Sequence, residues 1–165
     1  MSQPIAVLVA LVLASISTAA LAHETHGHHA TPTANAGDGQ KPFGRPGDPA
    51  QARRTIAVSM DDRMRYEPAV IRVRQGETVK LVATNHGQVL HEIVLGTLAG
   101  LREHAELMRR FPGMEHEEPF MAHVKPAGRE ELVWQFNRPG EFFYGCLVPG
   151  HFEAGMVGRI VVQSR

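Results

Sequence analysis

Residues 140–162 read GEFFYGCLVPGHFEAGMVGRIVV, and this stretch decides the fold. Its potential metal donors Cys146, His151 and Met156 follow one another at five-residue intervals. The residues on either side, 141–146 and 157–162, have the apolar and aromatic content of β-strands, and Pro149-Gly150 predicts a turn between them. A loop that joins two strands in this way can fold a thiol, an imidazole and a thioether around one point. The stretch therefore predicts a β-sheet protein with a metal-binding loop.

The combination of donors indicates which metal this loop would bind. Thiolate and thioether are soft ligands and imidazole is borderline, and two histidines, one cysteine and a weak axial methionine describe a type 1 copper site. Cys146 is the single cysteine of the chain, which excludes a disulfide framework, a CxxC pair and any four-cysteine zinc or iron–sulfur site. The second histidine must come from elsewhere. His91, at the start of a predicted strand, is well placed, and His86 is the competing candidate.

The rest of the chain indicates an all-β fold with one helix. Apolar residues alternate with polar ones in short segments, and seven such strands predict a β-sandwich. The predicted strands cover residues 55–60, 69–73, 79–83, 90–95, 131–136, 141–146 and 157–162. Residues 97–111 instead place apolar side chains at helical spacing, with Thr97 as cap and Pro112 as stop. Residues 112–128 are expected to form an irregular loop, so the insertion spans 97–128.

The first 54 residues differ in composition from the rest. Residues 1–22 carry no charged side chain and end in Ala20-Leu21-Ala22, which predicts a secretory signal peptide; a retained membrane anchor is the alternative. Residues 23–54 contain four closely spaced histidines and one aromatic residue, Phe43, and we expect them to be a disordered, histidine-rich leader and linker. The folded domain would then span 55–165. We expect a periplasmic protein that has no membrane attachment after signal cleavage.

From Thr55 to Gln163 the chain resembles the cupredoxins, the blue-copper fold. The resemblance rests on the GEFFYGC strand, the spacing Cys-x4-His-x4-Met and the strand VGRIVV that follows. The histidine-rich leader, the segment LHEIVLG at 90–96 and the insertion with its methionines and histidines are similar to the CopI-type periplasmic copper-tolerance cupredoxins. The resemblance implies a cupredoxin-like Greek-key β-sandwich and one copper. It assigns His91 and His151 as nitrogen ligands, Cys146 as the thiolate and Met156 as the axial ligand.

Two positions depart from the common pattern of small blue-copper proteins. Many of these proteins follow the first histidine with asparagine and the cysteine with serine or threonine, and these side chains tie the two ligand loops together. Here the positions hold Glu92 and Leu147. The tie between the two loops is therefore absent or built differently. The sequence does not decide whether the absorption of the copper site is that of a blue or a green copper protein. The plainer alternative is that a core cysteine, a surface histidine and a packing methionine are close in sequence by chance.

The expected function is copper handling in copper tolerance, with one-electron redox chemistry at the metal. The alternative is a small soluble electron-transfer cupredoxin of a respiratory or photosynthetic chain. Accessory copper could bind at the leader or the insertion; the alternative is that these residues belong to a soluble tail, the core and a solvated loop. The residues concerned are His23, His26, His28 and His29 in the leader, and Met108, Met114, His116, Met121 and His123 in the insertion.

Composition and local sequence also narrow the partners and exclude classes of function. The chain has 17 basic and 17 acidic residues, so nothing favours nucleic-acid binding. Gly145 and Leu147 flank the cysteine where multicopper oxidases and nitrite reductases carry histidines, so we do not expect an enzyme. The expected partners are a redox protein or other periplasmic copper-handling proteins, and the expected state is a monomer. Leu147, Val148, Pro149 and Phe152 would form an apolar docking patch; the alternative is that they are isolated surface hydrophobic residues without a role.

Overall fold

The computed structural model describes residues 39–114 and 116–165. The predicted signal peptide and the four leader histidines lie outside the described residues. No helix in the described part of the chain is long and apolar enough to cross a membrane.

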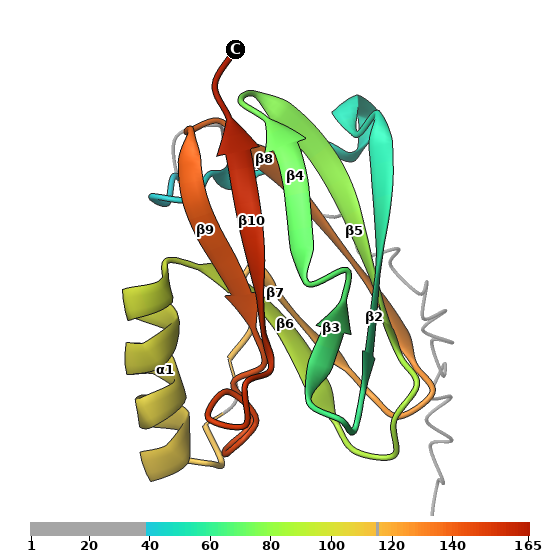
Figure 1. Ribbon diagram of the computed structural model, residues 1–165, viewed down its shortest axis with the longest axis vertical. Coiled ribbons are helices and arrows are strands. Elements are labelled where there is room, and N and C mark those ends of the chain that lie inside the picture. The colour runs from blue at the N-terminus through green and yellow to red at the C-terminus, as the bar shows by residue number, and fades with distance from the viewer. Residues whose placement is uncertain (1–38, 115) are drawn as a thin grey trace, which may run out of the picture. The chain divides into compact units, whose positions relative to one another are not determined.

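Two five-stranded sheets form a sandwich (Figure 1). The first has the order β1 (Arg45–Pro46), β8 (Arg129–Phe136), β5 (Glu77–Asn85), β2 (Arg54–Asp61), β3 (Arg65–Glu67). The second has the order β4 (Val70–Arg74), β10 (Val157–Gln163), β9 (Gly140–Gly145), β6 (His91–Gly96), β7 (Met121–Val124). Strands β2 and β5 pair in parallel, as do β4 and β10, and the other neighbours are antiparallel. The predicted all-β sandwich is confirmed.

The core lies between the sheets and follows the predicted alternation. On β8, Leu132, Trp134 and Phe136 are buried while the residues between them are partly exposed. All six residues of β6 are buried, because the sandwich core covers one face of this strand and a helix covers the other. Strand β6 also begins at His91, so the first candidate ligand sits on one of the most enclosed strands.

The inserted helix α1 (Leu98–Arg110) lies beside β6 and β9 (Figure 1). The Thr97 hydroxyl accepts a hydrogen bond from the Gly100 N–H, and the helix ends at Phe111, directly before Pro112, as predicted. Its apolar face joins a second core cluster beneath it, made of Val94, Leu101, Ala105, Met108, Met121 and Leu147. The helix thus closes the outer face of β6 next to the predicted metal loop.

The prediction that residues 23–54 are entirely disordered is wrong for residues 39–54. Phe43 is buried and stacks on Trp134 with ring centroids 5.5 Å apart, and its carbonyl accepts a hydrogen bond from the Trp134 indole N–H. Gly44 makes this approach possible, since its φ is 129° and a Cβ there would lie 2.3 Å from the Gln135 carbonyl oxygen. The segment was too poor in apolar residues to build a core of its own, but one aromatic side chain anchors it to an existing core.

The expectation of an irregular loop over 112–128 is also wrong in part. Residues 121–124 form β7, which pairs with β6, and both Met121 and Val124 are buried. Four residues are too few for an alternating pattern to be recognised, and the pairing with β6 is a long-range contact that local sequence does not specify.

Candidate metal centre

Three of the predicted ligands converge at one end of the sandwich. His91 opens β6, Cys146 directly follows β9, and His151 lies in the turn between β9 and β10. His91 Nδ1 lies 3.2 Å from His151 Nδ1, and Cys146 Sγ lies 3.3 Å from the same His151 atom. Donor atoms bound to one copper or zinc ion at about 2.0–2.3 Å are separated by about 3.2–3.8 Å at bond angles near 105–120°. The spacing of the donors therefore fits a single metal ion.

Burial differs among the three donors. His91 and Cys146 are 0% exposed, whereas His151 is partly exposed. The three ligand atoms lie within 4.8 Å of one another, and they form the only such histidine, cysteine and carboxylate group in the described residues. A metal held here would be shielded by protein on most sides and would reach solvent through the edge of one imidazole.

Backbone hydrogen bonds fold the loop that carries Cys146, His151 and Met156. The Cys146 N–H donates to the Met156 carbonyl over 3.1 Å, and the Met156 N–H donates to the His151 carbonyl over 3.0 Å. Gly150 turns the chain with a φ of 88°. Met156 is fully buried and belongs to the same core cluster as Cys146. The side-chain donor atoms of three predicted ligands are thus gathered at one place, and the backbone of Met156, the fourth, is paired with the loop that carries two of them.

The competing candidate, His86, does not join the group. Its side chain is exposed, its backbone N–H donates to the Met60 carbonyl, and it is absent from the cluster of potential metal donors. Of the two histidines considered from sequence, the geometry therefore favours His91.

Asp62, which the sequence did not single out, orients His91. Its Oδ1 lies 3.1 Å from His91 Nε2, which leaves Nδ1 of the ring facing His151 and Cys146. The backbone N–H of Gln88 donates to Asp62 Oδ2 over 2.7 Å, and this bond is the main reason that the pKa of Asp62 is lowered. A carboxylate on the distal nitrogen of a metal-binding histidine fixes the ring and its tautomer. The signal in the sequence was the acidic turn Asp61-Asp62 between β2 and β3.

Glu92 supplies the tie between the two ligand loops. Its backbone N–H donates to Cys146 Sγ over 3.3 Å, and its Oε2 accepts a hydrogen bond from the Leu147 N–H over 3.2 Å. Its Oε1 lies 2.9 Å from Nδ1 of His123, the residue opposite Glu92 in the β6–β7 register. The Tyr66 hydroxyl donates to the Glu92 carbonyl. The loop of His91 and the loop of Cys146 are therefore connected by hydrogen bonds. The tie is built differently from the common pattern, because a buried carboxylate takes the place of the usual side chains.

The electrostatics keep Cys146 protonated at neutral pH when no metal is bound. Burial raises the pKa of Cys146 to about 12, although N–H groups of Val148 and Glu92 partly oppose this effect. The pKa of His151 is lowered, first by burial and then by the neighbouring His91, so its imidazole is neutral at pH 7. Without metal the site thus holds a thiol and a free imidazole lone pair. A metal that binds the sulfur must displace its proton.

The structure does not expose all the residues that were predicted to form an apolar patch around His151. Leu147 is 1% exposed because it packs beneath α1, and Phe152 packs partly against the same cluster. The exposed large apolar side chains nearest in sequence to a candidate ligand are instead Val89 and Leu90, directly before His91. Leu147 therefore cannot contribute to a docking patch on the surface.

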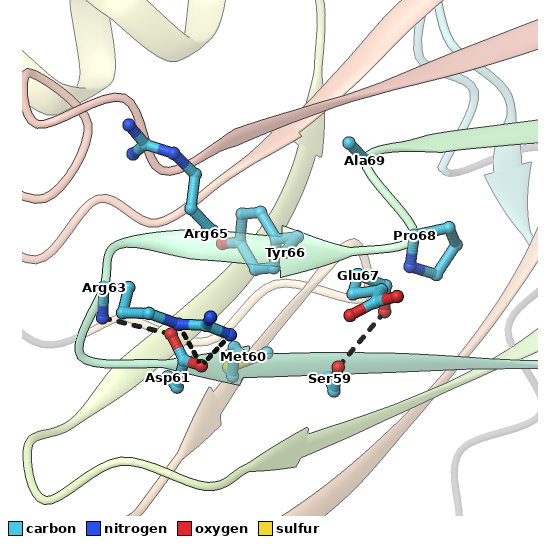
Figure 2. Close-up of a pocket in the computed structure, with 9 residues that line it drawn as sticks. All are labelled: Ser59, Met60, Asp61, Arg63, Arg65, Tyr66, Glu67, Pro68 and Ala69. Carbon is cyan, nitrogen blue, oxygen red and sulfur yellow. Dashed lines mark hydrogen bonds and ion pairs between the residues drawn. The ribbon is translucent and has the colours of Figure 1, made fainter.

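An open pocket of about 460 Å³ lies on the β2–β3 hairpin (Figure 2). Its lining includes Asp61 and Arg63, which form an ion pair across the turn. None of the four predicted copper ligands lines the pocket. The candidate site is therefore a cluster of donor atoms enclosed by protein, and the pocket is a separate surface feature.

Comparisons with known proteins agree with this geometry. Residues 53–163 match the family described as copper binding proteins, plastocyanin/azurin family. The copper-resistant cuproprotein CopI of Rubrivivax gelatinosus is 48% identical over 161 residues, which cover 98% of this chain and 96% of that protein. The CopI cuproprotein of Pseudomonas aeruginosa is 33% identical over 150 residues, covering 73% and 82% of the two chains.

Solved structures show the same fold. Auracyanin B superposes with a TM-score of 0.61 at 19% identity, covering 73% of this chain and 96% of that one. The reduced auracyanin of Roseiflexus castenholzii gives a TM-score of 0.58 at 20% identity, covering 67% and 98%. With the family match over residues 53–163 and the convergent donors of His91, Cys146 and His151, the chain belongs to the plastocyanin/azurin family of copper-binding proteins, the cupredoxins.

Proposed function

We propose that this protein is a periplasmic type 1 copper protein that acts in copper resistance. His91, His151 and Cys146 are the proposed equatorial ligands and Met156 the proposed axial ligand. The observation that carries the proposal is the convergence of one buried thiol and two imidazole nitrogens within 4.8 Å of one another. The relatives that are named copper-resistant cuproproteins support the cellular role.

The residues of the site would each contribute to this role. A bound copper ion supplies a one-electron couple between Cu(I) and Cu(II). Asp62 holds His91 in one orientation, and Glu92 fixes the loop that carries Cys146. Complete burial protects the sulfur from oxidants, which matters for an unpaired thiol in an oxidising compartment. His151 is the most exposed of the three donors, and it provides the route by which an electron would enter or leave.

The uncharged apolar segment at residues 1–22, which ends in a signal-peptidase pattern, supports the periplasmic location. We further propose a monomer that exchanges electrons or copper with other periplasmic proteins and catalyses no reaction of its own. The partly exposed His151 also suits the second candidate function, a soluble electron carrier. The identity to copper-resistance proteins over almost the full chain favours the first.

A growth experiment distinguishes these functions. Deletion of the gene should sensitise cells to copper, and the native chain should restore growth. A Cys146→Ser variant should fail to restore it, whereas the control variant His86→Gln should succeed, because His86 is exposed and outside the site. If the deletion leaves copper tolerance unchanged and instead slows respiratory or photosynthetic electron transfer, the second function is correct.

A further inference from the structure

A second pair of histidines faces each other on the outer side of the molecule, at α1. The rings of His104 and His116 have centroids 4.7 Å apart and an interplanar angle of 39°. For the candidate copper ligands His91 and His151 the corresponding values are 5.0 Å and 53°. Two imidazoles that share a metal at about 2.0–2.1 Å have ring centroids at most about 6.4 Å apart. The second pair therefore satisfies the same distance condition as the first.

The hydrogen bonds of His116 are incomplete. Both of its ring nitrogens are buried, and neither has a hydrogen-bond partner in the described part of the chain. Buried polar atoms without a partner are rare in native proteins, and an unfilled metal or water position is one of their explanations. The ring of His116 thus has a nitrogen lone pair that no neighbouring group in the described residues binds.

His104 supplies the complementary imidazole. The pKa of His104 is lowered, chiefly by burial and then by His116, so the ring is neutral and can donate a lone pair at pH 7. The acidic groups that act on His104 in the opposite direction are Glu92 and Glu118.

The two rings are held by separate elements. His104 lies in α1, between Leu101 and Ala105, which anchor the helix in the second core cluster. The carbonyl of His116 lies 3.2 Å from Nε2 of His123, whose Nδ1 is bound to the buried carboxylate of Glu92. The pair is therefore connected to the folded core on both sides, and its spacing does not depend on two long flexible side chains.

Two of the three methionines of the insertion do not compete for this role. Met108 and Met121 are 7% and 9% exposed and pack in the core cluster beneath α1. Met114 is half exposed. The donors gathered in the insertion are therefore imidazoles, which are borderline ligands and suit Cu(II), rather than the thioethers that suit Cu(I).

We propose that His104 and His116 form a second metal site, distinct from the type 1 site, that binds one Cu(II) ion with water completing the coordination. Among divalent first-row metals, Cu(II) binds most tightly to such nitrogen donors. The site goes beyond the proposed type 1 centre and does not depend on it. In a copper-resistance protein it would add to the copper that each chain can hold.

Copper stoichiometry tests this proposal on the purified full-length chain. The chain is loaded with excess Cu(II), freed of unbound metal and analysed for copper per protein. His104→Gln and His116→Gln should each lower the content by about one copper per chain relative to the native protein, while the thiolate-to-copper absorption stays unchanged. His86→Gln is the matched control and should lose none. Copper bound by the leader histidines is the same in all four proteins and cancels in the comparison.

A second measurement keeps the test decisive if a variant folds poorly. Titration of the native chain with Zn(II), a diamagnetic probe, should shift the ring nitrogen resonances of His104 and His116 together at one equivalent bound per pair. Unchanged copper content in both variants, or ring nitrogens that do not respond to Zn(II), would overturn the proposal. Loss of the type 1 absorption in Cys146→Ser with the second copper retained would leave this site intact and would show that the two sites are independent.

Discussion

Replacement of Glu92 by glutamine should weaken both the fold and the copper site, because one carboxylate connects three segments. Oε2 accepts the Leu147 N–H at 3.2 Å, and Oε1 lies 2.9 Å from His123 Nδ1. A glutamine carries no charge and has one acceptor oxygen, so one of these two contacts loses its carboxylate oxygen and the other is no longer charge-assisted. Glu92 is 4% exposed and Leu147 1%, so water cannot easily replace the lost bond.

The expected cost in the free energy of unfolding is about 2 kcal/mol, the usual range for a buried donor left without its charged acceptor. For a domain of this size that lowers the melting temperature of the metal-free protein by roughly 6–8 °C. In the copper-loaded protein the thiolate-to-copper absorption should also shift, since Leu147 directly follows Cys146 and the loop is no longer fixed.

The matched control is Glu141→Gln, in which an exposed carboxylate loses an ion pair with Arg159 on the neighbouring strand. Exposed ion pairs contribute little to stability, so this variant should melt close to the native protein and keep its absorption spectrum. If Glu92→Gln and Glu141→Gln behave alike in both thermal unfolding and absorption, the argument that Glu92 ties the ligand loops is refuted.

Three further changes test other parts of the account. Asp62→Asn should lower copper affinity about 10- to 100-fold in competition with a chelator, because Asp62 orients His91, and unchanged affinity would contradict that role. Copper affinity should rise about tenfold per pH unit between pH 7 and 9, because the pKa of Cys146 is raised to about 12 and binding releases its proton; a flat profile would show that the sulfur is not bound as thiolate. Gly158→Ala should destabilise the protein by about 2–3 kcal/mol in urea unfolding, since a Cβ would lie 2.1 Å from Cζ of the buried Tyr144, whereas Gly113→Ala, with no atom within 4 Å, should not. Equal stability of the two glycine variants would contradict this packing.

Local sequence was sufficient to predict the long strands and the helix. The alternation over residues 131–136 correctly assigned the buried face of β8, residues 157–162 were correctly predicted as a strand, and Thr97 and Pro112 marked the ends of the helix. Strands β1, β3 and β7 have two, three and four residues, which is too short for periodicity to be detected. Phe43 was noticed as a lone aromatic residue, but its place on Trp134 depends on a contact across more than 90 positions.

The same distinction applies to the site. Cys146, His151 and Met156 could be found because their spacing within one loop is a local pattern. Asp62 and His123 could not, because Asp62 reaches His91 from a different sheet and His123 reaches Glu92 through the β6–β7 register. Glu92 and Leu147 were recognised as departures from a common pattern, yet the way in which they replace the missing tie is a property of the folded chain alone.

A crystal structure of the copper-loaded chain tests the central claim most directly. We predict a copper ion about 2.0–2.3 Å from His91 Nδ1, His151 Nδ1 and Cys146 Sγ, with the Met156 sulfur as a longer fourth contact. A chain whose copper lies elsewhere, with these three donors unbound, would contradict the account.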